Sequence, residues 1–432
     1  MANDNKVHDG SSEPQSGFGA PGVGLIDYVA LPEGTTTRTI SFKAPDGGTS
    51  RGILHARGGE RTVVCISHPR ADMSQHYAIP QLIEAGYACY SHQCRGLNND
   101  IDCVHEELLL DLATGYRHLK DALGYEKIVL LGNSGGGSLF SFYQSQASKA
   151  PKARVLHSPG GDPTLLDKIE MPKADGLMFI AVHPGEGVFM LDEIDPSIPD
   201  EGDPLSVDPA LDMYDPGNGF RAPPEPSQYS ASFLERFRAA QRARVARLDA
   251  KAKGHIAEQN RFKQMMGEPS YGNLPLPERI YIERRAKVGY YMIIYRTEAN
   301  PAYCDLRLKS WRSTRTVGSV VGPRPDVMNY ARGGHSRLIT PRAWLSSWSG
   351  LSSNASIEET IKFNQDPLFI VAFTGDHGCF PEDNKRQLEA CPAKDKEMAF
   401  SAANHFGYPL DERTKAVNLL VEWMRKRYPR NA

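Results

Sequence analysis

The junction at residues 127–137 narrows the folds open to this 432-residue chain more than any other segment. An apolar run, KIVLL at 127–131, passes directly into Gly-Asn-Ser-Gly-Gly-Gly at 132–137, and a helix-compatible segment follows. A strand that turns this sharply into a helix strains the backbone at the turn and projects one side chain above the sheet. Gly132 and Gly136 let strand and helix approach without a Cβ clash. The junction therefore predicts a strand–turn–helix unit that presents Ser134.

Strand-like runs and helical patterns alternate on both sides of this junction. A hairpin is predicted from 38–43 and 50–56, because Asp46-Gly47-Gly48 between them tolerates positive φ. The other predicted strands are 62–67, 86–91, 127–131, 176–182, 367–373 and 397–402, with helices at 75–85, 104–123 and 411–427. Continuous apolar strands separated by helices predict an α/β fold, a mostly parallel sheet with helices on both faces.

A different kind of segment interrupts this alternation. Residues 195–229 contain eight prolines, and a long helix is predicted at 230–266, followed by a strand-like run at 288–295. We divide the chain into a disordered polar arm (1–30), the first part of the core (31–199), an inserted, mainly helical cap (200–355) and the second part of the core (356–432). An insertion after the sixth strand should cover the carboxyl ends of the strands, where ligands bind.

The charge balance limits the kinds of partner. The chain has 50 Lys and Arg residues against 52 Asp and Glu residues, a net charge of −2. It therefore lacks the excess of positive charge that would favour binding to nucleic acid or to an anionic membrane. The five arginines between 236 and 247 are therefore interpreted as a solvated helix face. A small-molecule substrate is the expected partner, and the sequence leaves open whether the chain forms a homo-oligomer.

The cysteines and the N-terminal residues bear on compartment and cofactors. The seven cysteines include no CxxC pair, so neither a metal site nor a redox site is expected. The polar start lacks the apolar core of a signal peptide, and no run of 18 apolar residues occurs. The sequence predicts a cytoplasmic protein that needs no cofactor and no metal.

A serine at such a turn needs a base and an orienting acid. His405, in Asn404-His405-Phe406-Gly407, follows the last predicted strand, and Asp376, in Thr374-Gly375-Asp376, follows the strand before it. Loops at the carboxyl ends of parallel strands meet at one edge of a sheet, so Ser134, Asp376 and His405 are the predicted catalytic residues. Asp383 and Asp162 remain as replacement acids, and His377 is a weaker base candidate.

Two main-chain amides are predicted to hold an oxyanion. Gly135 lies at the start of the helix after the serine, where an amide points at bound anions. The second donor should come from His68-Pro69-Arg70-Ala71-Asp72, the loop after the strand at 62–67. Pro69 has no N–H, so Arg70 is the predicted donor and Ala71 the alternative. Arg95, after the next strand, is interpreted as structural.

Through the hairpin, the HPRAD loop, the RG loop, GNSGG, TGD and NHFG, the chain resembles the α/β-hydrolase fold superfamily over about 38–195 and 356–432. The resemblance implies a Ser134–Asp376–His405 triad, with amide donors at Gly135 and Arg70. Two positions depart from the family's pattern. His68-Pro69 stands where His-Gly is usual, and the spacing from Asp376 to Pro381 is one residue longer than in D-x-x-V-P.

These features predict a serine hydrolase that cleaves a carboxylic ester of a small to medium apolar substrate through an acyl-enzyme. A thioesterase or a C–C bond hydrolase would use the same triad. A non-catalytic ligand-binding protein is the alternative of another class, and a peptidase is disfavoured by the long cap. Four aromatic residues of the cap belong either to a substrate pocket or to the core of the cap. They are Tyr290, Tyr291, Trp344 and Trp348.

Overall fold

An eight-stranded sheet forms the centre of the computed structural model, which describes residues 30–97, 101–331, 335 and 338–430. The predicted disordered arm at 1–30 lies outside these residues except for its last position. The strands are β1 (Thr36–Lys43), β2 (Thr49–Ala56), β3 (Thr62–Ser67), β4 (Ala88–Gln93), β5 (Lys127–Asn133), β6 (Gly176–Ile180), β9 (Leu368–Phe373) and β10 (Lys396–Ser401). Their order in the sheet is β1-β2-β4-β3-β5-β6-β9-β10. The pairs β1–β2 and β2–β4 are antiparallel, and every later pair is parallel.

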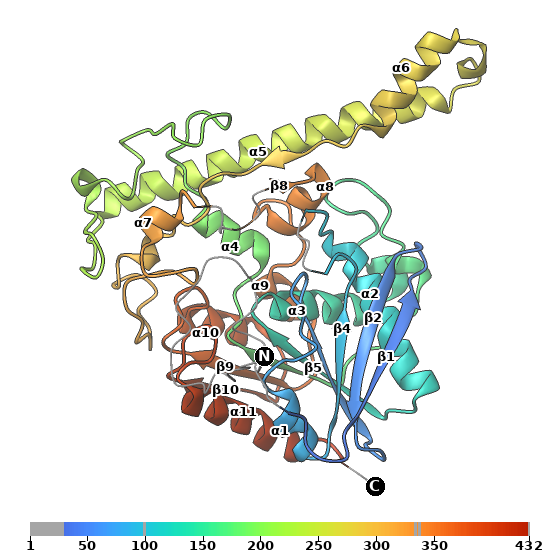
Figure 1. Cartoon of the computed structure of the whole chain (residues 1–432), viewed down its shortest axis with the longest axis vertical. Coiled ribbons are helices and arrows are strands. Elements are labelled where there is room, and N and C mark those ends of the chain that lie inside the picture. The colour runs from blue at the N-terminus through green and yellow to red at the C-terminus, as the bar shows by residue number, and fades with distance from the viewer. Residues whose placement is uncertain (1–29, 98–100, 332–334, 336–337, 431–432) are drawn as a thin grey trace, which may run out of the picture.

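Helices cover both faces of this sheet, which explains why the central strands β3, β4, β5, β6 and β9 are buried at every position except Lys127. The side chains of α1 (Ile79–Glu84) and α11 (Leu410–Arg425) pack into one hydrophobic cluster with one set of strand residues. Those of α2 (His105–Arg117) and α3 (Gly135–Ala147) pack into another with the opposite set. Figure 1 shows α11 and α1 on one side of the sheet and α2 and α3 on the other. The predicted α/β architecture is therefore the observed one.

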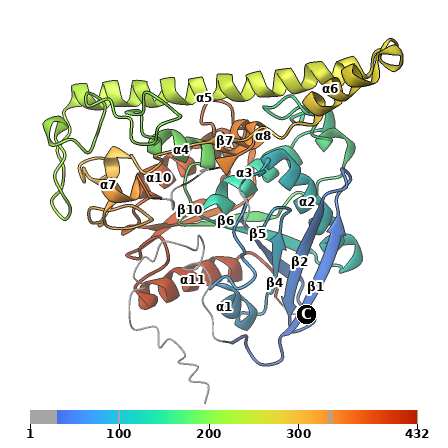
Figure 2. The same ribbon diagram turned by 45° about the horizontal axis from the view of Figure 1, so that its top comes forward.

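The cap interrupts the sheet between β6 and β9. Its helices are α4 (Glu186–Glu193), α5 (Ala231–Met266), α6 (Leu276–Lys287), α7 (Pro325–Met328) and α8 (Pro341–Ala343), and α9 (Ile357–Thr360) and α10 (Pro381–Ala390) flank β9. The long helix α5 crosses the whole cap, and α6 packs at its far end, away from the sheet (Figures 1 and 2). Side chains from α4, α5 and α8 share one core with Trp344 and Trp348. The cap thus lies above the sheet and has its own apolar centre.

A buried ion pair joins the segment just before the cap to a residue well within it. Arg296 Nη2 lies 2.6 Å from Asp195 Oδ2, and both side chains are almost fully enclosed. Asn329 donates to the same carboxylate oxygen at 2.6 Å. Because a buried charge is costly without partners, these contacts fix the start of the cap against its later loops.

Several predicted elements differ from those observed. The strand predicted at 86–91 begins at Ala88, because Gly86 adopts φ 90° in the preceding turn. The strand-like run 288–295 forms a shorter strand than predicted. Only β7 (Met292–Ile293) is paired, because its partner β8 (Leu338–Ile339) is two residues long. Six α-helices of the described residues were not predicted from the sequence: α4, α6, α7, α8, α9 and α10.

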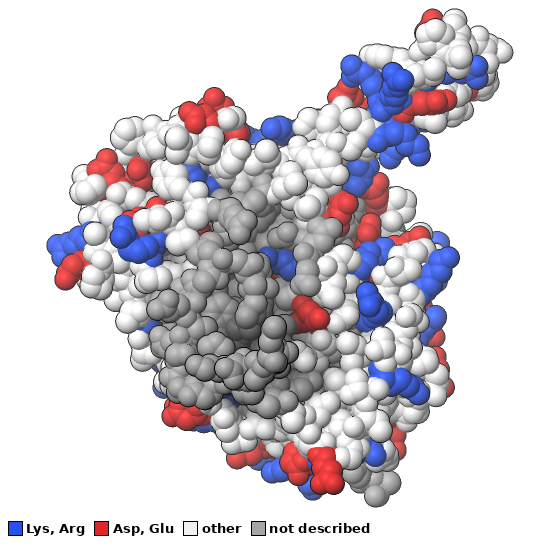
Figure 3. Space-filling view, viewed as in Figure 1, with Lys and Arg blue, Asp and Glu red and all other residues white. Residues whose placement is uncertain are grey.

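The surface carries charges of both signs. On the face shown in Figure 3, Lys and Arg side chains are interspersed with Asp and Glu, and both signs also occur on the projecting end formed by α5 and α6. Across the residues whose positions are described, none of the helices is both long and apolar enough to cross a membrane.

Candidate active site

Ser134 lies at the sharp turn between β5 and α3. Its backbone adopts φ 53° and ψ −123°, a conformation that non-glycine residues rarely occupy, and its amide donates to the carbonyl of Ala181 at 3.1 Å. A Cβ on Gly136 would lie 2.3 Å from the carbonyl oxygen of Ser67. A Cβ on Gly132 would lie 2.7 Å from Gly137 Cα. The glycines therefore permit a close approach that holds Ser134 in the strained turn expected of a nucleophile.

Asn133, the residue before the serine, stabilises this turn through its side chain. Asn133 is fully buried, and its side-chain Nδ2 donates to the carbonyl of Ile180 at 2.9 Å. Its side-chain oxygen lies 3.3 Å from Nε2 of His76, and the Nδ1 of His76 accepts from the amide of Ala78. Since Nδ1 accepts, the proton of the neutral ring is on Nε2, where it can be donated to Asn133. These contacts were not foreseen from the sequence.

The predicted acid and base form a hydrogen-bonded pair. His405 Nδ1 lies 2.8 Å from Asp376 Oδ2, and Asp376 is fully buried. The other carboxylate oxygen of Asp376 accepts from the amides of Gly378 and Cys379 at 2.8 and 2.9 Å. A carboxylate fixed in this way accepts the Nδ1 proton of the imidazole, so the lone pair is on Nε2, which a general base requires.

No hydrogen bond joins Ser134 to His405 in this structure, in which both residues are described. In hydrolases without substrate, such contacts are often long and tighten only when substrate binds. Ser134 follows β5, Asp376 follows β9 and His405 follows β10, so all three lie at the carboxyl edge of the parallel strands. The strained serine at a strand–helix turn and the chain order Ser, Asp, His distinguish one fold.

The chain has the α/β-hydrolase fold. Replacing its buried acid by asparagine, Asp376→Asn, is expected to lower kcat by about 10⁴-fold, because the amide would favour the wrong tautomer of His405. Far-ultraviolet circular dichroism and ester hydrolysis would be measured on the same preparations. Asp383→Asn serves as the matched control, since Asp383 binds Lys309 and Arg386 and not His405. A control that loses as much activity as Asp376→Asn would contradict the assigned acid.

Comparisons with known proteins found only remote likenesses. No family model matches the sequence, and no curated protein matches it. Among solved structures, the α/β hydrolase GrgF from Penicillium sp. sh18 is 12% identical over 90% of this chain and 98% of its own, with a TM-score of 0.47. DcsB, solved with a substrate analogue, is 13% identical over 90% and 99%, with a TM-score of 0.46. The Pyrococcus furiosus esterase Pf2001 is 11% identical over 91% and 93%, with a TM-score of 0.41. We base the assignment on the chain's own sheet and elbow.

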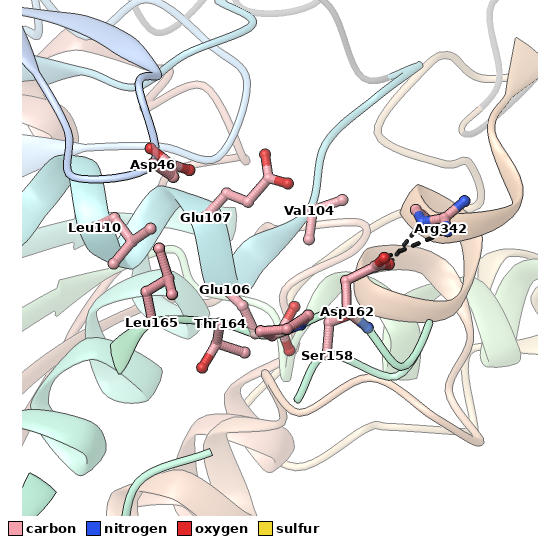
Figure 4. Close-up of a pocket in the computed structure, with 11 residues that line it drawn as sticks. Asp46, Val104, Glu106, Glu107, Leu110, Ser158, Asp162, Thr164, Leu165 and Arg342 are labelled. Carbon is pink, nitrogen blue, oxygen red and sulfur yellow. Dashed lines mark hydrogen bonds and ion pairs between the residues drawn. The ribbon is translucent and has the colours of Figure 1, made fainter. Parts of the chain in front are cut away.

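The alternative acids and base lie in other contacts. Asp162 Oδ2 accepts from Arg342 Nε at 2.6 Å, at the edge of a cavity of about 250 Å³ beside α2 (Figure 4). None of the three predicted catalytic residues lines that cavity. His377 Nε2 lies 3.3 Å from Thr316 Oγ1 of the cap. Of the candidates, only Asp376 and His405 are brought together.

The second predicted oxyanion donor is engaged elsewhere. The amide of Arg70 donates to Nδ1 of His68 at 3.2 Å, and the amide of Ala71 donates to the same nitrogen at 3.0 Å. Gly135, the first predicted donor, is the first residue of α3, so its amide lies at a helix N-terminus. The Gly135 amide therefore lies where the sequence predicted it, whereas the amides of Arg70 and Ala71 both donate to the His68 ring. The sequence could not show this, because it depends on a side-chain rotamer.

A buried carboxylate lies beside the elbow. Ser138 of α3 donates to Glu186 Oε2 at 2.8 Å, and His105 Nε2 lies 3.5 Å from the same oxygen. Burial raises the pKa of Glu186, but nearby His105, His183 and Ser138 outweigh it and hold that pKa below its usual value. The first residues of α2, α3 and α4 converge here, and helix N-termini stabilise negative charge. Glu186 is therefore an ionised group fixed at the side of the elbow.

The four aromatic residues of the cap singled out in the sequence differ in burial and in their contacts. Trp344 is fully buried and donates from its indole to Asp249 at 2.8 Å, so it belongs to the core of the cap. Tyr290 donates to Glu258, and Tyr291 is more than half exposed. Of the four, only Trp348 contacts the loop after β3, because the Arg70 guanidinium lies 4.8 Å from its ring centre.

Two groups among the described side chains have the spacing of metal ligands. One consists of Asp376, Cys379 and His405. Burial raises the pKa of the Cys379 thiol well above its ordinary value, and both carboxylate oxygens of Asp376 already accept hydrogen bonds, so this group fits an acid–base pair better than a metal. The other consists of Glu193, Glu298 and His335 in the cap. There His335 Nδ1 lies 3.1 Å from Glu193, so a shared proton accounts for the contact.

Proposed function

We propose that this chain is a serine hydrolase that cleaves a carboxylic ester of a small to medium apolar substrate through an acyl-enzyme. The observation that carries the proposal is the buried Asp376–His405 pair, which lies at the same edge of the sheet as the strained Ser134. A surface histidine has no need of a fully buried carboxylate that is itself fixed by two amides. Such an arrangement is what a general base requires.

In the proposed reaction, Ser134 Oγ attacks the carbonyl carbon of the ester while Nε2 of His405 takes the hydroxyl proton. Asp376 holds the imidazole in the required tautomer and stabilises its positive charge. The carbonyl electron pair moves onto oxygen, which the Gly135 amide stabilises. Collapse of this intermediate expels the alcohol, protonated by His405. Water, activated by the same histidine, then releases the acid and restores Ser134.

A fluorophosphonate probe tests the nucleophile directly. The folded protein is incubated with the probe, and the adduct is located by mass spectrometry of the peptide that contains Ser134. Labelling of that peptide is expected, and prior heat unfolding should abolish it because reactivity depends on the assembled site. A folded protein that neither takes the label nor turns over any ester would instead indicate the ligand-binding alternative.

A substrate panel tests the reaction class. p-Nitrophenyl esters of increasing acyl length are compared with the matching coenzyme A thioesters and with a β-diketone as a C–C substrate. The proposal expects the highest kcat/KM on an oxygen ester of short to medium chain length. A preference for the thioester or the diketone would keep the triad but replace the substrate class.

A further inference from the structure

His68 is the first residue after β3, and its ring lies beside the residue that follows the nucleophile. Only 6% of its surface is exposed. Its Nε2 lies 2.9 Å from the point that a Cβ on Gly135 would occupy, and Oε1 of Glu186 lies 2.1 Å from the same point. An imidazole nitrogen therefore lies on one side of the residue whose amide is the predicted oxyanion donor.

Two main-chain amides determine where the proton of this ring is. The amides of Arg70 and Ala71 both donate to Nδ1, at 3.2 and 3.0 Å. A nitrogen that accepts must carry the lone pair, so the hydrogen of the neutral ring is on Nε2. Within the residues whose positions are described, no acceptor takes this hydrogen. The ring therefore directs this N–H toward the side of Gly135, where the carboxylate of Glu186 also lies without a hydrogen bond to His68.

The environment keeps the ring neutral. Burial lowers the pKa of His68 well below its ordinary value, and the guanidinium of Arg70 acts in the same direction. The pKa of His68 is also lowered by His183, His405 and His105. A neutral imidazole neither takes nor releases a proton at neutral pH, but it remains a hydrogen-bond donor. Neutral histidines serve as electrophiles in other enzymes.

We propose that the Nε2–H of His68 is the second oxyanion donor, beside the Gly135 amide and in place of the main-chain amide of Arg70. The inference rests on the proposed serine hydrolase function. As Ser134 forms its bond to the carbonyl carbon, the carbonyl electron pair moves to oxygen, and His68 donates a hydrogen bond to that oxygen without transferring its proton. The hydroxyl proton goes to His405. Preorganised donors of this kind include histidine side chains.

The competing role is structural, because Nδ1 also fixes the turn at Arg70 and Ala71. Two substitutions separate these roles. In His68→Asn the side-chain oxygen can replace Nδ1 as the acceptor, but no donor reaches the position of Nε2. In His68→Gln the amide nitrogen can replace Nε2 as the donor, but the acceptor for the two amides is lost. The two nitrogens of the ring are thus tested independently.

The expected result is a loss of kcat in His68→Asn of about 10²–10³-fold with little change in KM, as for other oxyanion donors. Affinity for a trifluoromethyl ketone, which forms a tetrahedral adduct, should fall by a similar factor. His68→Gln should retain kcat within about tenfold, with a lower thermal midpoint. A purely structural role predicts the reverse order, with Gln the poorer enzyme.

The control is His92→Asn, which removes another buried histidine, one that lies near Tyr90 and away from the elbow. It should lower stability without lowering kcat. If His68→Asn keeps kcat within about threefold of the wild type, the His68 proposal is overturned while the hydrolase function stands. If His68→Asn does not fold, a folded His68→Gln decides, since loss of its kcat overturns the proposal. If the folded wild-type protein shows neither labelling nor turnover, the proposed hydrolase function is wrong, and the inference about His68 is wrong with it.

Discussion

Replacing Ser134 by alanine is expected to lower kcat by about 10⁶-fold, the scale found when a catalytic serine is removed from other triad enzymes. The fold should persist, because alanine occupies the same strained turn and the Asp376–His405 pair does not depend on the hydroxyl. Fluorophosphonate labelling should vanish, while KM for any residual hydrolysis should change little. Ester hydrolysis at high enzyme concentration would measure the remaining rate.

The matched control for this variant is Ser141→Ala. Ser141 is also buried in α3, but its hydroxyl lies 2.6 Å from that of Thr360 and does not reach the catalytic edge. Its loss should cost about 1 kcal/mol of stability through the missing hydrogen bond and leave kcat unchanged. Turnover above about one per cent of wild type in Ser134→Ala would exclude Ser134 as the nucleophile.

A steep loss of stability in mild acid is the second large expected effect. Burial lowers the pKa of four histidines that the fold encloses: to about 4 for His76 and His183, to about 3 for His92, and well below its ordinary value for His68. In the unfolded chain a histidine takes up its proton near pH 6.5. Below that pH the unfolded state therefore binds more protons, and the free energy of unfolding falls with falling pH down to about 4.

Each buried histidine contributes up to about 1.4 kcal/mol per pH unit in this window, so the four together give about 5 kcal/mol per unit. Urea unfolding followed by tryptophan fluorescence between pH 7.5 and 5 would measure the slope. His92→Asn should reduce that slope by about a quarter. A free energy of unfolding that changes by less than about 1 kcal/mol between pH 7 and 5.5 would contradict the expectation.

The parts of the molecule that could be predicted are those determined by residues close together in the sequence. The apolar run before Ser134 and the glycines after it determine the elbow, because no bulkier residue fits that close approach. Asp376 and His405 could be chosen because each follows one of the last two predicted strands, and parallel strands end at one edge. Their hydrogen bond is a consequence of that edge and not of any motif around them.

The parts that escaped prediction depend on contacts between distant segments. Glu186, His105 and Ser138 come from three different helices, and no spacing in the chain connects them. The helix α4 begins at Glu186, directly after Pro184 and Gly185, between the strand predicted at 176–182 and the proline-rich passage at 195–229, and no helix was predicted there. The sequence also does not reveal that the ring of His68 accepts from the amides of both Arg70 and Ala71, the two residues considered for the second oxyanion donor.

The insertion of the cap between β6 and β9 has a consequence for synthesis on the ribosome. The strand that carries Ser134 is complete long before β9 and β10, which carry Asp376 and His405, leave the exit tunnel. During that interval β6 is an open sheet edge, the kind of surface that invites pairing with other chains. A nascent polypeptide therefore holds Ser134 before it has the Asp376–His405 pair, which it gains only when its last strands close the sheet.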